Sequence, residues 1–174
     1  SSVRVAYGLK ENMSLFSGVH TTTMAFQTLQ LDLGLCYGIS DADGFKPGVS
    51  LNTVLNPMIS LRNGDTRIFP EFTPNLYWDL GDKHLLHLGM NNWFDFNGAS
   101  VEIGDGAVWH PSFQCGYRYT SKRWVLAAEY RVLNINKEIV VPQADVPTWI
   151  GTGGQGVYFS LNYRINGLKN KGNE

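Results

Sequence analysis

Near its carboxyl end the chain alternates between apolar and polar residues. Between residues 156 and 165 every odd position is apolar, and the even positions after Gly156 hold Tyr158, Ser160, Asn162 and Arg164. Successive side chains of a β-strand point to opposite faces of a sheet, whereas those of a helix repeat about every 3.6 residues. A period of two therefore predicts a strand with one apolar and one polar face.

The same alternation recurs along the chain, and no segment has a convincing helical period. It predicts nine strands, at residues 3–9, 13–19, 28–39, 47–55, 67–80, 84–96, 108–119, 123–133 and 156–165. Pro70 and Pro74 lie inside the fifth of these. Each proline lacks a ladder N–H, so we expect this strand to be locally irregular or partly at an edge. The predicted fold is all-β: an antiparallel up-and-down barrel of about eight to ten strands.

Composition limits the class of protein further. The length of 174 residues suits one domain, and 14 basic against 15 acidic residues leave a formal charge of −1, which gives no field for binding nucleic acid. Hydrophobic residues make up 43% of the chain, yet no run approaches the ~18 apolar residues of a membrane helix. The start, Ser1–Arg4, does not have the charged and apolar segments of a signal peptide.

The lengths of the connections favour a transmembrane barrel over a soluble barrel whose apolar face points inward. Short connections at 10–12, 40–46, 81–83 and 120–122 alternate with longer ones at 20–25, 56–66, 97–107 and 134–155. Short turns at one rim and long loops at the other are typical of outer-membrane barrels.

The distribution of residue types points the same way. Every lysine falls in a turn, a loop or the carboxyl tail, while the polar strand positions carry mainly Ser, Asn, Gln, Gly, His and Arg. This set suits a narrow, hydrogen-bonded interior better than a water-facing surface. Aromatic residues gather on the apolar face close to the short-turn rim, where a membrane interface would lie. This predicted girdle comprises Tyr7, Tyr37, Trp78, Tyr119, Trp124 and Tyr163.

With these features the chain resembles the small bacterial outer-membrane barrels of the OmpA and OmpX type. The resemblance covers nearly the whole chain and rests on architecture, so it implies a location but no particular activity. It implies the outer membrane of a Gram-negative bacterium, with outer-membrane lipid around the strands. We expect a barrel domain at residues 1–166 and a polar tail at 167–174.

The count of nine departs from the even number usual in such barrels. If the short turns and the carboxyl end are periplasmic, the amino terminus would be extracellular. Two explanations remain open: a strand missing upstream of Ser1, or a short tenth strand within one of the long loops.

Charged residues are densest on the polar face of the last three predicted strands. They are Arg118, Glu129, Arg131 and Arg164, with Glu71, Asp79 and Asp95 on neighbouring strands. Buried charges need partners, and a barrel of this size has an interior barely wider than its side chains. The main interpretation is a salt-bridged plug that fills the lumen, and the alternative is gating or ion passage.

One constellation is compatible with catalysis. His110 and Ser112 share a strand face, and Glu129 lies on the next strand; together they resemble the His-x-Ser and Glu arrangement of outer-membrane lipid A deacylases. The resemblance implies a lipid hydrolase in which the carboxylate orients the imidazole. The chain departs from that pattern at Pro111, has no Asn-Ala after Ser112, and is predicted to turn the pair toward the lumen. A histidine and a serine in a lumen hydrogen-bond network is the simpler interpretation.

Metal, cofactor and disulfide chemistry are not expected. His84 and His87 are three apart on a strand and should point to opposite faces. The glycine-rich segment 151–156 leads into a strand and lacks the Lys and the helix of a phosphate loop. Cys36 falls on the polar face and Cys115 on the apolar face, so we expect two free thiols.

The predicted function is that of a non-enzymatic outer-membrane barrel, a structural or accessory subunit that presents loops to another envelope protein. A lipid hydrolase and a narrow channel are the alternatives. The longest loop, 134–155, carries an apolar set expected either to contact the partner or to fold back onto the barrel mouth. The set is Ile139, Val140, Val141, Trp149 and Ile150.

Overall fold

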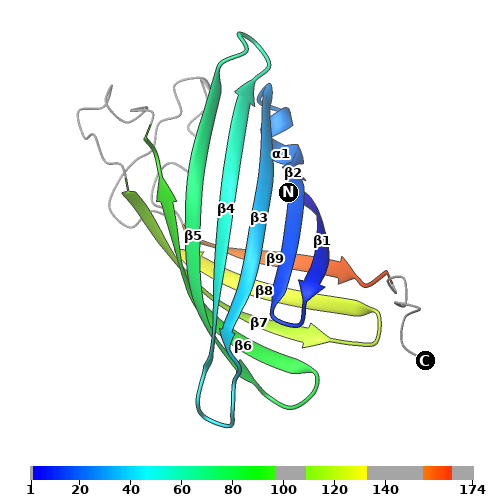
Figure 1. The fold of residues 1–174 in the computed structure, drawn as a ribbon. Helices are drawn as coiled ribbons and strands as arrows, with labels where there is room; N and C mark the ends of the chain where they lie inside the picture. Colours follow the sequence, from blue (N-terminus) through cyan, green and yellow to red (C-terminus); the bar gives the residue numbers. More distant parts are fainter. Residues whose placement is uncertain (1, 97–108, 133–154, 166–174) are drawn as a thin grey trace.

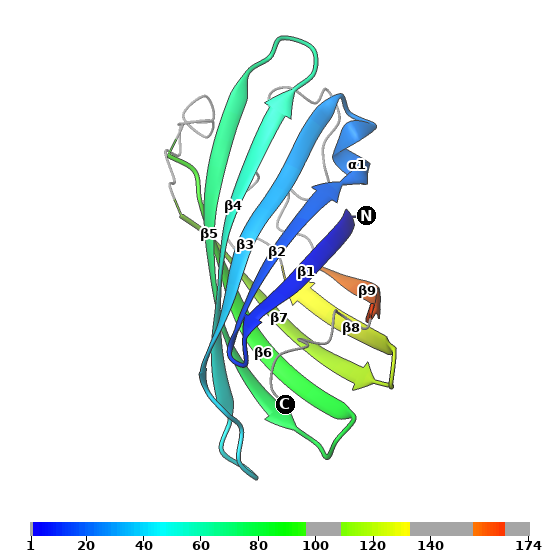
Figure 2. The same cartoon turned by 45° about the vertical axis from the view of Figure 1, so that its right-hand side comes forward.

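The computed structural model describes residues 2–96, 109–132 and 155–165, which form a single antiparallel sheet of nine strands in chain order (Figure 1). The strands are β1 (Ser2–Lys10), β2 (Met13–His20), β3 (Thr28–Ser40), β4 (Gly48–Ser60), β5 (Thr66–Asp79), β6 (His84–Phe94), β7 (Trp109–Thr120), β8 (Trp124–Val132) and β9 (Gln155–Tyr163). The sheet curls into a half-barrel with β1 and β9 as its edges (Figures 1 and 2). The predicted all-β, up-and-down fold is confirmed.

The register of the ladders defines two faces. Leu33 of β3 lies opposite Ser17 and Leu55, and we call the side that these residues share the outer face. Asp32 lies opposite Gly18 on the other side, the inner face. The two cysteines are free; Cys36 pairs with inner-face Asn52, and Cys115 with outer-face Leu88.

The predicted end of the fourth strand is wrong. β4 continues to Ser60, so the connection expected at 56–66 shrinks to residues 61–65. Asn56 and Pro57 are turn-forming types, but here Asn56 is 2% exposed on the inner face and its Nδ2 donates to Phe69 O at 3.2 Å. This tertiary contact outweighs the local turn preference of the Asn-Pro pair.

The two prolines of β5 have the expected local effect. The β4–β5 ladder runs unbroken through Pro70 and Pro74. On the other side of β5, pairing with β6 is interrupted at Thr73 and Pro74, and the described residues before Glu71 have no β6 partner. Because proline donates no N–H, it interrupts one ladder while leaving the other intact.

One short helix interrupts the all-β pattern. α1 (Thr21–Met24) is a single turn between β2 and β3, and the Thr23 hydroxyl donates to His20 O at 2.9 Å. Gln27 then adopts φ 56° to bring the chain into β3. In the described part of the chain, no helix has the length and apolar character needed to cross a membrane.

Glycines allow large side chains to lie flat on the inner face. A Cβ added at Gly34 would overlap the ring of Phe16, and one at Gly48 would overlap the ring of Tyr77. Each ring comes from the neighbouring strand and covers the glycine backbone. The inner layer is therefore closely packed at these two positions.

Candidate functional site

The two faces of the sheet have opposite chemistry. Among the described residues Val54 is the one buried hydrophobic residue, whereas the buried polar residues are Gln30, Asp32, Asn56, Ser60, Thr73, Asn75, Asp95 and His110. On the outer face the large apolar side chains are exposed, with Leu33 at 52% and Phe113 at 47%. Apart from Lys10 at the first turn, no Lys, Arg, Asp or Glu of the described strands faces outward. A soluble barrel has the reverse arrangement.

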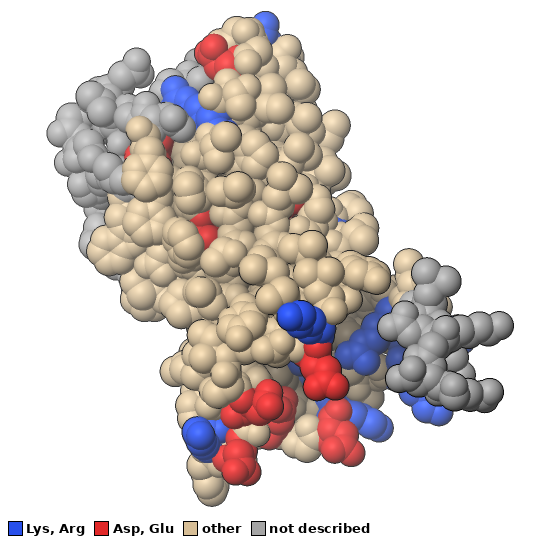
Figure 3. All heavy atoms as spheres, viewed as in Figure 1, with Lys and Arg blue, Asp and Glu red and all other residues tan. Residues whose placement is uncertain are grey.

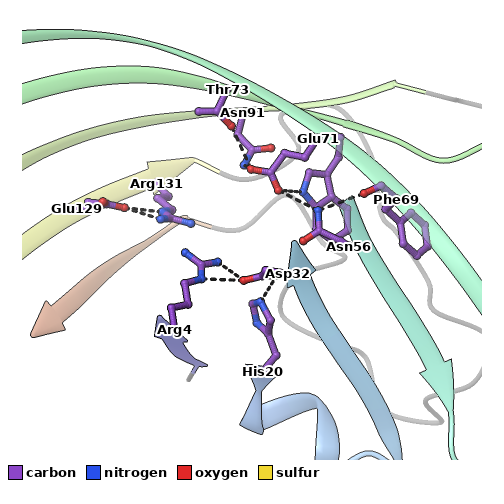
Figure 4. A network of polar contacts seen from close by, with 11 residues as sticks. Arg4, His20, Asp32, Asn56, Phe69, Glu71, Thr73, Asn91, Glu129 and Arg131 are labelled. Atoms are coloured by element: carbon purple, nitrogen blue, oxygen red, sulfur yellow. Dashed lines mark hydrogen bonds and ion pairs between the residues drawn. The ribbon is translucent and has the colours of Figure 1, made fainter. Parts of the chain in front are cut away.

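The most deeply buried charge is Asp32 on β3, which is fully buried (Figure 4). Arg4 of β1 donates to Asp32 Oδ2 through Nε at 2.7 Å and approaches it through Nη2 at 2.6 Å. His20 of β2 places Nε2 2.8 Å from Oδ1. Both oxygens are thus engaged, as a buried carboxylate requires.

Arg4 reaches Asp32 by passing over β2. The residue beneath its side chain is Gly18, which lies between Arg4 and Asp32 in the register. A Cβ at Gly18 would meet the Arg4 side chain and the backbone O of Val3. The glycine therefore permits an ion pair that spans three strands and ties the edge strand β1 to the sheet.

A second cluster surrounds Glu71 on β5 (Figure 4). Its Oε1 accepts from Asn91 Nδ2 at 2.6 Å and Thr73 Oγ1 at 3.1 Å. Its Oε2 accepts from Trp93 Nε1 at 2.6 Å and Asn56 Nδ2 at 3.2 Å. Four neutral donors from β4, β5 and β6 occupy the acceptor sites of one carboxylate, which leaves little capacity for a further ligand.

A third cluster joins β6, β8 and β9. Arg131 donates to Glu129 Oε2 through Nε at 2.9 Å and Nη2 at 2.5 Å, and its guanidinium lies 5.0 Å from the centre of the Tyr158 ring. His87 places Nε2 3.6 Å from Glu129 Oε1. Gly116 of β7 lies beneath the His87 and Glu129 side chains, because a Cβ there would meet both.

The charged residues predicted as one network thus occupy several places. Glu129 and Arg131 are paired, Glu71 belongs to its own cluster, and Arg118 lies on the inner face opposite Leu85 and Ala127. Arg164 follows β9, exposed, with its backbone N–H donating to Arg123 O. The cluster of Arg4, His20 and Asp32 was not among the sites predicted from the sequence. An aspartate in the middle of a long apolar-faced strand was the available signal.

The structure does not bring Glu129 to the histidine and serine of the predicted hydrolase pattern. Ser112 lies opposite Asn91 and His110 opposite Trp93, whereas Glu129 lies opposite Gly116, further along β7. His110 is buried, and its Nδ1 makes no hydrogen bond within the described ranges. In the strand register, His110 lies opposite Trp93 of β6, and Trp93 lies opposite Glu71 of β5. The Glu71 carboxylate already accepts hydrogen bonds from four donors.

The aromatic residues of the predicted girdle lie on the outer face near the short turns. Trp78 Nε1 donates to Phe45 O at 3.1 Å, so its ring is fixed against the 41–47 turn. Trp124 and Tyr163 meet edge to face, with ring centres 4.8 Å apart. Tyr37 pairs with Met13 and Leu51, and Tyr119 pairs with His84 and Leu126.

The apolar loop residues Ile139, Val140, Val141, Trp149 and Ile150 lie outside the described residues. Within the described ranges, no three His, Cys, Asp or Glu side chains are grouped to hold a metal ion. Comparison with known proteins found no matching family model, no similar curated protein and no similar solved structure.

Proposed function

We propose that this sheet is the wall of a transmembrane β-barrel in the outer membrane of a Gram-negative bacterium. The observation that carries the proposal is the inverted distribution of side chains: apolar residues exposed on the outer face and polar residues buried on the inner face. Monomeric soluble proteins rarely expose an apolar surface of this extent, because it costs free energy in water. Lipid acyl chains remove that cost.

The ends of the outer face support the same proposal. Figure 3 shows most of the charged side chains gathered at the short-turn end, others at the opposite end, and few over the middle of the strands. The outward-facing Tyr37, Trp78, Trp124 and Tyr163 lie near the strand ends at the short-turn side of the sheet. Aromatic rings with a polar edge favour the headgroup region, and charged turns favour the water beyond it.

Within the membrane, the proposed role is non-enzymatic, that of a structural or accessory subunit of an envelope assembly. The clusters around Asp32, Glu71 and Glu129 engage each of these carboxylates in a contact with another strand: Asp32 with Arg4, Glu71 with Asn91 and Glu129 with His87. This use of charge suits a rigid wall that holds its connecting loops for another envelope protein. The architecture fits the resemblance to OmpA and OmpX, and we extend it to location and not to activity.

Substitution of Leu33 by Arg tests the lipid-facing assignment. Leu33 lies mid-strand on the outer face, and an arginine at mid-membrane depth should lower the free energy of unfolding by about 2–4 kcal/mol. Urea titration of protein refolded into lipid vesicles provides the measurement. Phe45→Arg is the matched control, because Phe45 is fully exposed in a turn and its replacement should have little effect. A Leu33→Arg protein as stable as wild type, and soluble without detergent, contradicts the proposal.

The proposed partner contact is tested through the longest loop. Trp149→Ala with Ile150→Ser should leave the barrel folded and release a protein that co-purifies with the wild type in mild detergent, because aromatic anchors contribute strongly to interfaces. Unchanged heat-dependent mobility on a denaturing gel checks the fold. If nothing co-purifies with the wild type, or the double variant retains it, the subunit role is wrong.

A further inference from the structure

A hollow of about 490 Å³ lies in the outer face where β5 to β9 run side by side. Its outward lining contains two small residues beside large rings: Cys115 lies opposite Tyr130 in one ladder row, and Ala128 lies opposite Tyr117 in the next outward row. Small side chains beside larger ones therefore form a depression in an otherwise bulky apolar surface.

The chemistry of this hollow suits an apolar ligand. Its outward-facing lining consists of aromatic rings, aliphatic side chains and the Cys115 thiol. The two ionisable members of the lining, His87 and Glu129, belong to the inward row, where His87 Nε2 lies 3.6 Å from Glu129 Oε1. Because these two groups face each other, the hollow offers a ligand methylene and ring contacts and no free charge.

The position of the hollow along the strands matches the acyl region of one leaflet, if the outer face lies in a membrane as proposed above. Leu88 of the lining is four residues from His84 at the short-turn end of β6, or about 13 Å along the strand. Half of a hydrocarbon core is about 15 Å thick. His84 itself faces outward, with Nδ1 hydrogen-bonded to the Tyr117 hydroxyl, and so places polar atoms between the hollow and the rim.

Basic residues lie at the rim directly beyond His84. The turn at 81–83 is held beside the turn at 121–123, because Thr120 N donates to Lys83 O at 2.7 Å. The two turns carry Lys83, Lys122 and Arg123, all exposed, and Arg123 Nη1 lies 3.5 Å from the outward Tyr163 hydroxyl. Within the described ranges, none of these three basic residues forms a salt bridge.

The charge of the rim is unevenly distributed in favour of this position. The two turns beside the hollow hold three basic residues against one acidic residue, Asp82. The other short turns, at 10–12 and 41–47, hold two basic residues against three acidic ones. Clusters of Lys and Arg at a membrane surface attract anionic headgroups. The positive part of the rim thus lies next to the apolar hollow.

We propose that the hollow and the basic turns together bind one anionic phospholipid. Its phosphate contacts Lys83, Lys122 and Arg123, and one acyl chain lies in the hollow over Cys115 and Ala128. The volume of the hollow falls within the ~300–1,000 Å³ of small-ligand sites. This inference rests on the proposed membrane location and adds to it a preferred lipid at a defined place on the wall.

The test uses Trp78, which lines the hollow, as the reporter. A variant that keeps Trp78 and replaces the other tryptophans by Phe is refolded into phosphatidylcholine vesicles. A minor fraction of the lipid is brominated on its acyl chains and is either phosphatidylglycerol or phosphatidylcholine. Quenching of Trp78 should show an association about fivefold stronger for phosphatidylglycerol, the order of effect of one basic residue near an anionic headgroup. A variant keeping Trp109, outward at the other end of β7, should show no preference.

Two further changes separate the parts of the site. Lys83→Gln with Lys122→Gln should abolish the preference at Trp78, while Lys10→Gln with Lys46→Gln, in the other short turns, should leave it. Ala128→Leu fills the hollow and should also abolish the preference, although the basic turns are intact. Thr53→Leu is its control, because Thr53 faces outward on β4, away from the hollow.

Each contrary result has a distinct meaning. Equal quenching of Trp78 by the two brominated lipids overturns the lipid site and leaves the membrane location standing. A preference that persists in Ala128→Leu, or that Trp109 shares, shows only general attraction of anionic lipid to the rim and also overturns the site. Absence of quenching by either lipid, at both Trp78 and Trp109, overturns the membrane location and the site together.

Discussion

Among single residues, Asp32 depends most on its neighbours. It is fully buried, and the two side chains that hold it come from positions 28 and 12 residues away in the chain. Arg4→Met should lower the free energy of unfolding by about 1–3 kcal/mol, because a buried carboxylate loses a charged hydrogen-bond donor. The same change in an Asp32→Asn background should lower the free energy of unfolding much less, since no buried charge is left unpaired. Equal losses in both backgrounds, from urea titrations, would show that the ion pair adds nothing.

Two inner-face glycines provide a matched test of packing. A Cβ at Gly34 would overlap the Phe16 ring, whereas one at Gly8 meets nothing within 4 Å. Gly34→Ala should destabilise the protein by about 1–3 kcal/mol through overpacking, and Gly8→Ala should be close to neutral. Adding Phe16→Leu to Gly34→Ala should restore part of the loss. Similar melting temperatures for the two alanine variants would contradict a tightly packed inner layer.

Among the elements, β5 depends on Glu71 to hold it to both neighbours. The ladder to β6 is interrupted near Pro74, and the carboxylate there accepts from Asn56 of β4 and from Asn91 and Trp93 of β6. Glu71→Ala should cost about 1–3 kcal/mol, because several part-buried donors lose their acceptor. Hydrogen exchange should speed up in β5 and β6 first. Glu11→Ala is the control, because Glu11 lies in an exposed turn. Comparable losses in the free energy of unfolding for both variants would contradict the role of Glu71 in holding β5 to β4 and β6.

The strands also show which features of the fold could be predicted from the sequence alone. The alternation of apolar and polar residues can be read from neighbouring positions in the sequence. It was therefore sufficient to predict the nine strands, their two faces and the placement of Cys36 and Cys115 on opposite faces. The end of β4 was missed because Asn56-Pro57 reads as a turn until the contact with Phe69 is known. The pairing of charges was missed because it depends on the register between strands. Nothing near Asp32 in the sequence indicates that Arg4 crosses Gly18 to reach it.

At the scale of the whole molecule, the proposed membrane location requires the outer face, and not the inner face, to meet lipid. Trp109 and Trp124 face outward and are 51% and 47% exposed. Trp93 faces inward, stacked on Phe69 with ring centres 5.4 Å apart and hydrogen-bonded to Glu71. These three residues report on the two faces of the same sheet.

The most direct test uses variants that keep one tryptophan and replace the others by Phe, reconstituted into vesicles of phosphatidylcholine brominated on its acyl chains. The lipid-facing assignment predicts strong quenching of Trp109 and Trp124 fluorescence and little quenching of Trp93, because bromine quenches only on close approach. Vesicles without bromine are the control for refolding. Quenching of Trp93 equal to that of the outward pair, or no quenching of any of the three, would contradict a barrel whose apolar outer face lies in the membrane.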